Sequence, residues 1–268
     1  MRYEARNYCR TVRVLVTGSS SGIGEAFARH HAAIGHEVIL NGRSVEALSQ
    51  VADSLSTRDS PVRYVVADLS TAEGVDTLVT ECGDVDIIVA NAGVTAAAAV
   101  GHADRDELDR LAYLMTAGVV RLCEALVPGM VARGSGDVVI VSSIAAFTPM
   151  RKSAPYAASK SFATAYARSL SLEVHDQGVR VVAVCPGYVR TDLHRRAGLD
   201  HLSSRVPGWM WLEPEDVVRS TIRALDRGKT VVVPGLAYRL VRPFLSSSVA
   251  QGTWRRLTRR PRPQAGGA

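Results

Sequence analysis

Cysteine is scarce in this 268-residue chain, and the placement of its few cysteines excludes several kinds of cross-linked site. Cys9, Cys82, Cys123 and Cys185 are widely spaced and form no C-x-x-C pair. Zinc sites, dithiol redox pairs and disulfide-rich secreted domains all depend on closely spaced cysteines. We therefore expect no metal site, and we expect the thiols to be reduced and packed inside the protein.

Long apolar runs are also missing. Residues 1–10 mix Arg, Glu, Asn and Tyr and contain no apolar core of a secretory signal. No stretch elsewhere has the apolar length that a membrane-spanning helix requires. These absences together predict a cytoplasmic protein.

Acidic residues are missing from position 237 to the end, where seven arginines occur. Setting these arginines aside lowers the formal net charge from +6 to about −1, so the basic balance predicts no nucleic-acid groove. The stretch 240–257 interleaves Arg with apolar residues. Two interpretations stay open for it: contact with an anionic membrane surface, which is the weaker, and packing against a neighbouring subunit. The Pro-, Gly- and Arg-rich residues 259–268 are typical of a disordered end.

What the sequence does contain is a regular alternation of short β-branched runs with longer amphipathic stretches. The strand-like runs are residues 12–16, 37–40, 62–66, 86–90, 137–141, 179–184 and 230–233. The helix-like stretches are residues 23–34, 44–56, 71–82, 104–131, 155–176 and 214–227. This alternation predicts an α/β fold, a doubly wound Rossmann-type parallel sheet of about seven strands with helices on both faces. We expect one domain over residues 1–236 and a basic extension over 237–268.

A glycine-rich segment, Thr17-Gly18-Ser19-Ser20-Ser21-Gly22-Ile23-Gly24, joins the first strand to the first helix. Glycine at such a junction permits a tight turn and lets a phosphate approach the backbone. The helix that follows offers free N–H groups and the positive end of its dipole to a pyrophosphate. The segment therefore predicts dinucleotide binding, against the alternative of a plain strand–helix turn. The binding residues would be Gly18, Ser20, Ser21, Gly22, Ile23 and Gly24.

The second strand ends in Asn41-Gly42-Arg43-Ser44 and carries no acidic residue there. Dinucleotide folds that prefer NAD place Asp or Glu at this point to hold the ribose 2′-hydroxyl, whereas a nearby Arg accommodates the 2′-phosphate of NADP. Arg43 therefore predicts NADP(H), with a hydrogen bond from Ser44 to the same phosphate. The alternative is a solvated surface arginine.

Two residues suited to acid–base chemistry, Tyr156 and Lys160, stand four apart in a helix-like stretch. This spacing places both side chains on one helix face. A nearby ammonium stabilises a phenolate and so lowers the pKa of the tyrosine. The fifth strand delivers Ser142 and Ser143 to the carboxyl edge of the sheet, where a hydroxyl can donate to a substrate oxygen that gains charge.

In the form and order of T-G-x-x-x-G-x-G, Asn-Ala-Gly and Tyr-x-x-x-Lys, the sequence resembles the short-chain dehydrogenase/reductase family. The resemblance covers about residues 11–233 and looks, toward its end, like bacterial ketone or acyl reductases. It implies that Ser143, Tyr156 and Lys160 are catalytic, that the latter two also contact the cofactor, and that Ser142 lines it. It further implies cofactor contacts from Asp68, Leu69, Asn91, Ala92, Gly93, Pro186, Gly187, Val189 and Thr191. Without the resemblance, Asp68 would equally serve as a helix N-cap.

One position departs from the family pattern. Members carry an Asn that holds a water for proton refilling, and the register places Met115 there, which cannot donate a hydrogen bond. This departure predicts either another proton route or slow turnover.

These motifs together favour an NADP(H)-dependent oxidoreductase. It would transfer a hydride between the nicotinamide and the carbonyl or alcohol carbon of a small-molecule ketone, aldehyde or 3-oxoacyl substrate. Leu199, Trp209, Met210 and Trp211 would form an apolar lid for a hydrophobic substrate, or serve only for packing. The resemblance implies a homo-dimer or homo-tetramer formed through residues 104–131 and 155–176. The alternative, supported only by Met115, is a catalytically weak NADP(H)-binding sensor or partner protein.

Overall fold

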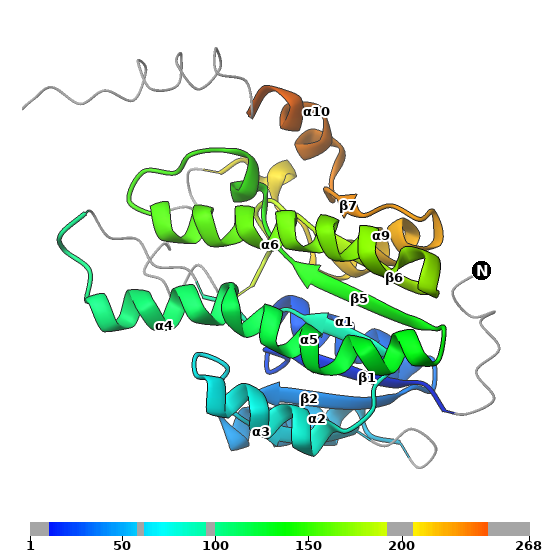
Figure 1. The fold of residues 1–268 in the computed structure, drawn as a ribbon. Coiled ribbons are helices and arrows are strands. Elements are labelled where there is room, and N and C mark those ends of the chain that lie inside the picture. The colour runs from blue at the N-terminus through cyan, green and yellow to red at the C-terminus, as the bar shows by residue number, and fades with distance from the viewer. Residues whose placement is uncertain (1–10, 58–61, 95–99, 192–205, 246–268) are drawn as a thin grey trace, which may run out of the picture.

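Seven parallel strands form one sheet with the order β3-β2-β1-β4-β5-β6-β7 (Figure 1). The computed structural model describes residues 11–57, 62–94, 100–191 and 206–245. The strands are β1 (Arg13–Thr17), β2 (Glu37–Gly42), β3 (Val62–Val66), β4 (Ile87–Ala90), β5 (Gly136–Val141), β6 (Val179–Val184) and β7 (Val231–Val232). The predicted doubly wound sheet is confirmed. Its order reverses between β1 and β4, which is where such sheets bind ligands at their carboxyl edge.

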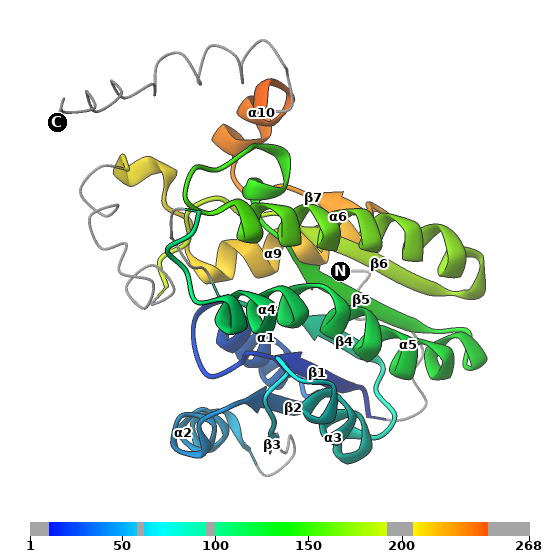
Figure 2. The ribbon, with the colours of Figure 1, turned by 60° about the vertical axis from the view of Figure 1, so that its left-hand side comes forward.

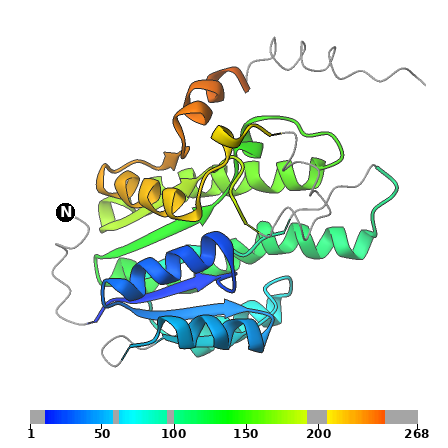
Figure 3. The same ribbon diagram turned by 180° about the vertical axis from the view of Figure 1, so that it is seen from behind.

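Helices cover both faces of the sheet, and each face has its own apolar core. One face carries α3 (Ala72–Cys82), α4 (Arg105–Met115), α5 (Ala117–Ala132) and α6 (Ala154–Val174). The other, seen from behind in Figure 3, carries α1 (Gly22–Ala33), α2 (Val45–Leu55) and α9 (Pro214–Asp226). Neighbouring residues of a strand enter opposite cores, as Val14 and Leu15 do. Coverage of both faces explains why β4 and β5 are buried along their whole length.

The helix expected over residues 104–131 is two helices that meet at Thr116. Thr116 leaves the helical region with φ −130° and ψ −90°, and its hydroxyl donates to the Ala112 carbonyl oxygen at 2.6 Å. Gly118 lets α5 begin close to the loop that follows β3. A Cβ on Gly118 would lie only 3.1 Å from the Leu69 carbonyl oxygen in that loop. Hydrophobic spacing alone does not reveal a break of one residue.

The stretch Arg105–Ala132 is long and apolar enough to cross a membrane by length and composition alone. The expectation that the chain has no such stretch is therefore wrong by these criteria. The apolar side chains have another explanation, because Leu122, Leu126 and Met130 are buried against the sheet.

A further helix, α10 (Leu236–Leu245), lies in the segment expected to be an extension (Figure 2). Its Tyr238 is 6% exposed and belongs to the same apolar core as residues of α5 and α6. The helix also contacts the short 3-10 turn η2 (Ile144–Phe147) that follows β5. Residues 246–268, including the end expected to be disordered, lie outside the described residues, as does Leu199.

Candidate active site

The glycine segment between β1 and α1 has no room for side chains at its glycines. Gly18 and Gly22 have φ of +61° and +62°, in the left-handed region that favours glycine. A Cβ on Gly24 would fall on the Gly18 carbonyl oxygen and 2.6 Å from Nδ2 of Asn91. The side chain of Ser21 makes no hydrogen bond that caps α1, so the N–H groups in the first turn of α1 stay available to a ligand. This cradle fits the pyrophosphate of a dinucleotide.

Asn91, just after β4, holds the glycine segment through hydrogen bonds. Its Nδ2 donates to the carbonyl oxygens of Thr17 at 3.0 Å and Gly18 at 2.9 Å. The Thr17 hydroxyl in turn accepts from the backbone N–H groups of Asn91 and Ala92, both at 3.0 Å. Gly93 follows, and Lys160 Nζ lies 3.4 Å from the place of a Cβ there. The Asn-Ala-Gly segment thus connects the glycine segment to the reaction centre.

At the start of α2, Arg43 and Ser44 differ in how far their side chains are engaged. Arg43 is exposed and has no hydrogen bond or ion pair with the residues that the structure describes. Ser44 caps α2, because its Oγ accepts from the Ala47 N–H at 3.2 Å and donates to Glu46 at 2.8 Å. The hydroxyl expected to bind a phosphate therefore already serves the helix, whereas the guanidinium of Arg43 is available to an anion.

Asp68 and Leu69, which follow β3, have different surroundings. Asp68 is exposed, and its carboxylate accepts from the Ser70 N–H at 3.0 Å. The interpretation of Asp68 as a helix N-cap is wrong, because Thr71 caps α3 by accepting from the Gly74 N–H. Leu69 is buried in the core, so its side chain serves packing.

Ser143 and Tyr156 meet where β5 ends and α6 begins. Ser143 caps the turn η2, and its Oγ accepts from the Ala145 N–H at 3.1 Å. Burial raises the pKa of Tyr156, and a hydrogen bond with the Ser143 side chain lowers it by a smaller amount. The phenol of Tyr156 therefore stays protonated at neutral pH and can donate a proton.

Lys160 lies one turn further along α6 and is only 7% exposed. Its Nζ donates to the Val141 carbonyl oxygen at 2.9 Å and lies 5.7 Å from the centre of the Tyr156 ring. Burial lowers the pKa of Lys160 from 10.5 to about 8. We expected the ammonium to lower the pKa of Tyr156. Desolvation is instead the largest effect at both groups, and it raises the pKa of Tyr156 and lowers that of Lys160.

Ser142 packs beneath the reaction centre. Its Oγ donates to the Lys160 carbonyl oxygen at 2.7 Å and lies 2.8 Å from Oγ1 of Thr164. Thr164 in turn lies 3.6 Å from Sγ of Cys185. Ser142 is 3% exposed and connects β5 to α6 and to the segment after β6, so its side chain offers little surface to the cofactor that the resemblance placed beside it.

The segment after β6 returns toward the glycine segment. The Pro186 carbonyl oxygen accepts from the Ile144 N–H at 2.8 Å, next to Ser143. Val189 is buried and pairs with Leu212. The methyl carbon of Thr191 lies 2.8 Å from the place of a Cβ on Gly22. The structure therefore brings this segment, the glycine segment and the reaction centre to one edge of the sheet.

Two residues that sequence reasoning missed support this edge. Asn41, at the end of β2, is buried, and its Nδ2 donates to the carbonyl oxygens of Val65 at 3.2 Å and Ala67 at 3.3 Å. A polar residue in an otherwise apolar strand was the available signal. Tyr238 of α10 lies against Gly187, and nothing in its local sequence indicates that contact.

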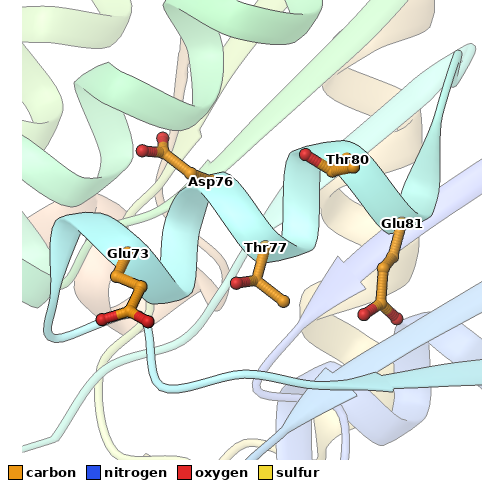
Figure 4. Close-up of a pocket in the computed structure, with 5 residues that line it drawn as sticks. All are labelled: Glu73, Asp76, Thr77, Thr80 and Glu81. Atoms are coloured by element: carbon orange, nitrogen blue, oxygen red, sulfur yellow. The ribbon is translucent and has the colours of Figure 1, made fainter.

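A hollow of about 530 Å³ lies elsewhere, along the surface of α3 (Figure 4). All of its lining side chains project from this one helix: Glu73, Asp76, Thr77, Thr80 and Glu81. Arg121 already binds the Asp76 carboxylate through two contacts of 2.6 Å. No residue of the reaction centre or the glycine segment lines this hollow, so it is not part of the candidate active site.

Comparison with known proteins agrees with this geometry. A family described as short chain dehydrogenase matches residues 12–201. A glycine betaine reductase of Emericella nidulans is 36% identical over 82% of this chain, which spans only 18% of that protein. The dehydrogenase/reductase SDR family member 7B of Bos taurus is 32% identical, and this chain spans 62% of its length. An uncharacterized oxidoreductase of Staphylococcus saprophyticus is 30% identical over 85% of this chain and 96% of its own.

Solved structures show the same relationship. A short-chain dehydrogenase from Sphingobium yanoikuyae in complex with NADPH has a TM-score of 0.78 and 28% identity, covering 96% of this chain and 99% of that one. L-sorbose reductase from Gluconobacter frateurii, complexed with NADPH and L-sorbose, has a TM-score of 0.73 and 28% identity, covering 84% and 96%. A putative betaketoacyl-ACP reductase has a TM-score of 0.74 and 31% identity, covering 85% and 98%. With the family match extending over most of its length, the chain belongs to the short-chain dehydrogenase/reductase family of oxidoreductases.

Proposed function

We propose that this chain is an NADP(H)-dependent oxidoreductase acting on a small, hydrophobic ketone, aldehyde or 3-oxoacyl substrate, or on the corresponding alcohol. The observation that carries the proposal is the meeting of Ser143, Tyr156 and Lys160 at the sheet edge where the glycine segment also lies. A proton donor, a hydrogen-bond donor for an oxygen and a dinucleotide cradle are the three parts that carbonyl reduction needs.

The chemistry divides between the cofactor and the protein. The nicotinamide, when bound, supplies or accepts the hydride. Ser143 holds the substrate oxygen, and Tyr156 donates a proton to it in the reductive direction. The raised pKa of Tyr156 keeps that proton in place at neutral pH. Lys160 keeps its charge below its pKa of about 8 and can donate to a ribose hydroxyl.

Arg43 supports a preference for NADP(H) over NAD(H). The last side chain of β2 is that of Asn41, whose Nδ2 already donates to the carbonyl oxygens of Val65 in β3 and of Ala67 just after it. The next side chain that is available to the 2′ position of the adenosine ribose is that of Arg43, whose guanidinium suits a phosphate. The NADPH in the Sphingobium and Gluconobacter structures favours the same choice.

Aromatic side chains support an apolar substrate. The rings of Trp211 and of Tyr188, which lies in the segment after β6, are 5.5 Å apart. Met210 packs against the core, whereas Trp209 is 72% exposed. The resemblance to a putative betaketoacyl-ACP reductase keeps 3-oxoacyl substrates among the candidates.

The test is NADPH consumption with a panel of hydrophobic ketones, aldehydes and 3-oxoacyl thioesters, with NADH in parallel. We expect turnover that prefers NADPH and falls by at least about a hundredfold in Tyr156→Phe, since one general acid contributes that much. In Arg43→Ala we expect KM for NADPH to rise about tenfold and KM for NADH to stay unchanged, because one charge-assisted contact is lost. NADPH binding without turnover of any substrate would contradict the proposed reductase activity and favour the sensor function.

A homo-oligomer formed through α4, α5 and α6 belongs to the same proposal. Phe162 and Leu172 on α6 are large apolar residues with 41% and 86% exposure, which a second subunit would cover. Light scattering should show a dimer or tetramer, and Leu172→Glu should shift it toward the monomer. A monomer in the unmodified chain would contradict this part of the proposal.

A further inference from the structure

Tyr238 of α10 connects three segments that are far apart in the sequence. Its hydroxyl donates to the Met210 carbonyl oxygen at 2.7 Å and accepts from the Tyr188 N–H at 3.0 Å. Tyr188 belongs to the segment after β6, and Met210 ends the 3-10 turn η4 (Gly208–Met210) before α9. We call Tyr188, Met210 and Tyr238 the tyrosine junction. One buried hydroxyl satisfies both a donor and an acceptor of the backbone there.

The ring of Tyr238 is fitted as closely as its hydroxyl. A Cβ on Gly187 would fall on the ring, so the chain admits the ring only because position 187 is glycine. Gly235, with φ +83°, approaches the same ring, and a Cβ there would lie 3.1 Å from ring Cδ2. At 6% exposure, the ring has little room to shift.

Backbone hydrogen bonds extend the junction along the segment after β6. The Leu212 N–H donates to the Tyr188 carbonyl oxygen, and the Arg190 N–H donates to the Leu212 carbonyl oxygen, both at 2.9 Å. Residues 188–190 are therefore fixed from two sides, by residues 210–212 and by α10. Their position depends on a helix that begins almost fifty residues later.

The same helix also reaches the turn that Ser143 caps. The guanidinium of Arg242 lies 4.7 Å from the centre of the Phe147 ring, at the end of η2. α10 thus contacts both the segment after β6 and the turn next to the reaction centre.

We propose that Tyr238 is a positioning residue that sets the segment 186–191 against the nicotinamide half of the cofactor. The proposal rests on the proposed function, because a dinucleotide must bind for the segment to act on it. Arg43 and Asp68, where the adenosine half would lie, follow β2 and β3, whereas Tyr238 contacts the segment after β6, toward the other end of the strand order. Loss of its hydroxyl should therefore weaken one half of the cofactor site and leave the other intact.

The test uses Tyr238→Phe, with Tyr166→Phe as the matched control. The buried hydroxyl of Tyr166 lies against the Cys123 thiol and binds no backbone group among the described residues, so the control removes the same atom without freeing a backbone donor or acceptor. Binding is measured for NADPH and for 2′,5′-ADP, which carries only the adenosine half. Amide hydrogen exchange is measured in a peptide covering residues 185–191, with no nucleotide present.

For Tyr238→Phe we expect NADPH to bind about three- to tenfold more weakly, because the partly buried Tyr188 N–H and Met210 carbonyl lose their partner. We expect unchanged 2′,5′-ADP binding and faster exchange at Tyr188, with neither effect in the control. Gly187→Ala keeps the hydroxyl but displaces the ring, and it should show the same selective loss.

Equal weakening of both ligands would indicate a general loss of structure and overturn the proposal. Unchanged NADPH binding would also overturn it, whatever the exchange shows, since the junction would then not reach the cofactor. If the unmodified chain binds neither nucleotide, the proposed function fails separately. In that case the exchange measurement decides only whether Tyr238 holds the segment 186–191, and unchanged exchange at Tyr188 would show that it does not.

Discussion

Replacing Lys160 by Met should stabilise the folded protein at neutral pH while it removes activity. Burial lowers the pKa of Lys160 from 10.5 to about 8, so the folded state holds the ammonium less favourably than the unfolded chain does. At pH 7 this difference is worth about 3 kcal/mol. Met fills the space of the lysine stem without a charge, but it leaves the Val141 carbonyl oxygen without its donor, at a cost of about 1 kcal/mol. We therefore expect a net gain of about 2 kcal/mol.

The pH dependence isolates the cause of this gain. Because the folded pKa is the lower one, the unfolded chain binds more protons between pH 8 and 10.5, and the unmodified protein gains stability as pH rises through that window. The same linkage predicts that the charge penalty falls from about 3 kcal/mol at pH 7 to about 1 kcal/mol at pH 9.5. The stability difference between Lys160→Met and the unmodified chain should shrink accordingly, whatever the packing effects.

Urea unfolding of both proteins at pH 7 and pH 9.5 measures this difference. Lys229, which is exposed, provides the control, and Lys229→Met should change stability by less than about 0.5 kcal/mol at either pH. A Lys160→Met variant that is less stable at pH 7 and shows the same stability difference at pH 9.5 would refute the lowered pKa of Lys160.

Three further predictions follow from the described contacts. Burial and the charges of His36 and His30 lower the pKa of His31, so the free energy of unfolding should fall as pH drops below 6.5. The fall should be steeper than in His31→Leu by up to about 1.4 kcal/mol per pH unit, as measured by urea unfolding at pH 7.5 and 5.5. Met115 and Lys160 both lie within 4 Å of the place of a Cβ on Gly93, so the two side chains are close together. If a missing proton relay limits turnover, Met115→Asn should raise it. Unchanged or lower turnover would argue against that defect. Gly24→Ala should cost about 1–3 kcal/mol and abolish detectable nucleotide binding, whereas Gly208→Ala, which meets open space, should do neither.

The order of strands and helices could be predicted from the sequence because each element carries its own local pattern. Two elements were misjudged where that pattern is incomplete. The break at Thr116 depends on the close approach of Gly118 to the Leu69 carbonyl, which no spacing of apolar residues encodes. α10 is short and contains Pro243, and the buried Tyr238 is its main tie to the core.

The site residues were predictable by type, whereas their chemical state was not. The Tyr-x-x-x-Lys spacing identifies which groups meet, but the pKa of each depends on how much water the surrounding elements exclude. Ser44 and Ser142 show a related limit. Both stand beside the expected ligand, yet one hydroxyl caps α2 and the other binds the Lys160 carbonyl. A motif places a side chain near a site without showing what else that side chain must do.

The glycines of the nucleotide segment show why sequence and structure give different reasons for the same residue. From the sequence, each glycine is explained by the approach of a phosphate. In the structure, Gly24 must be glycine because the Gly18 carbonyl and Asn91 occupy its Cβ position, and Gly22 because Thr191 does. The protein's own contacts therefore forbid side chains in the cradle before any ligand binds. Since Thr191 closes the segment after β6 against Gly22, a larger residue at either position would disturb both halves of the cofactor site at once.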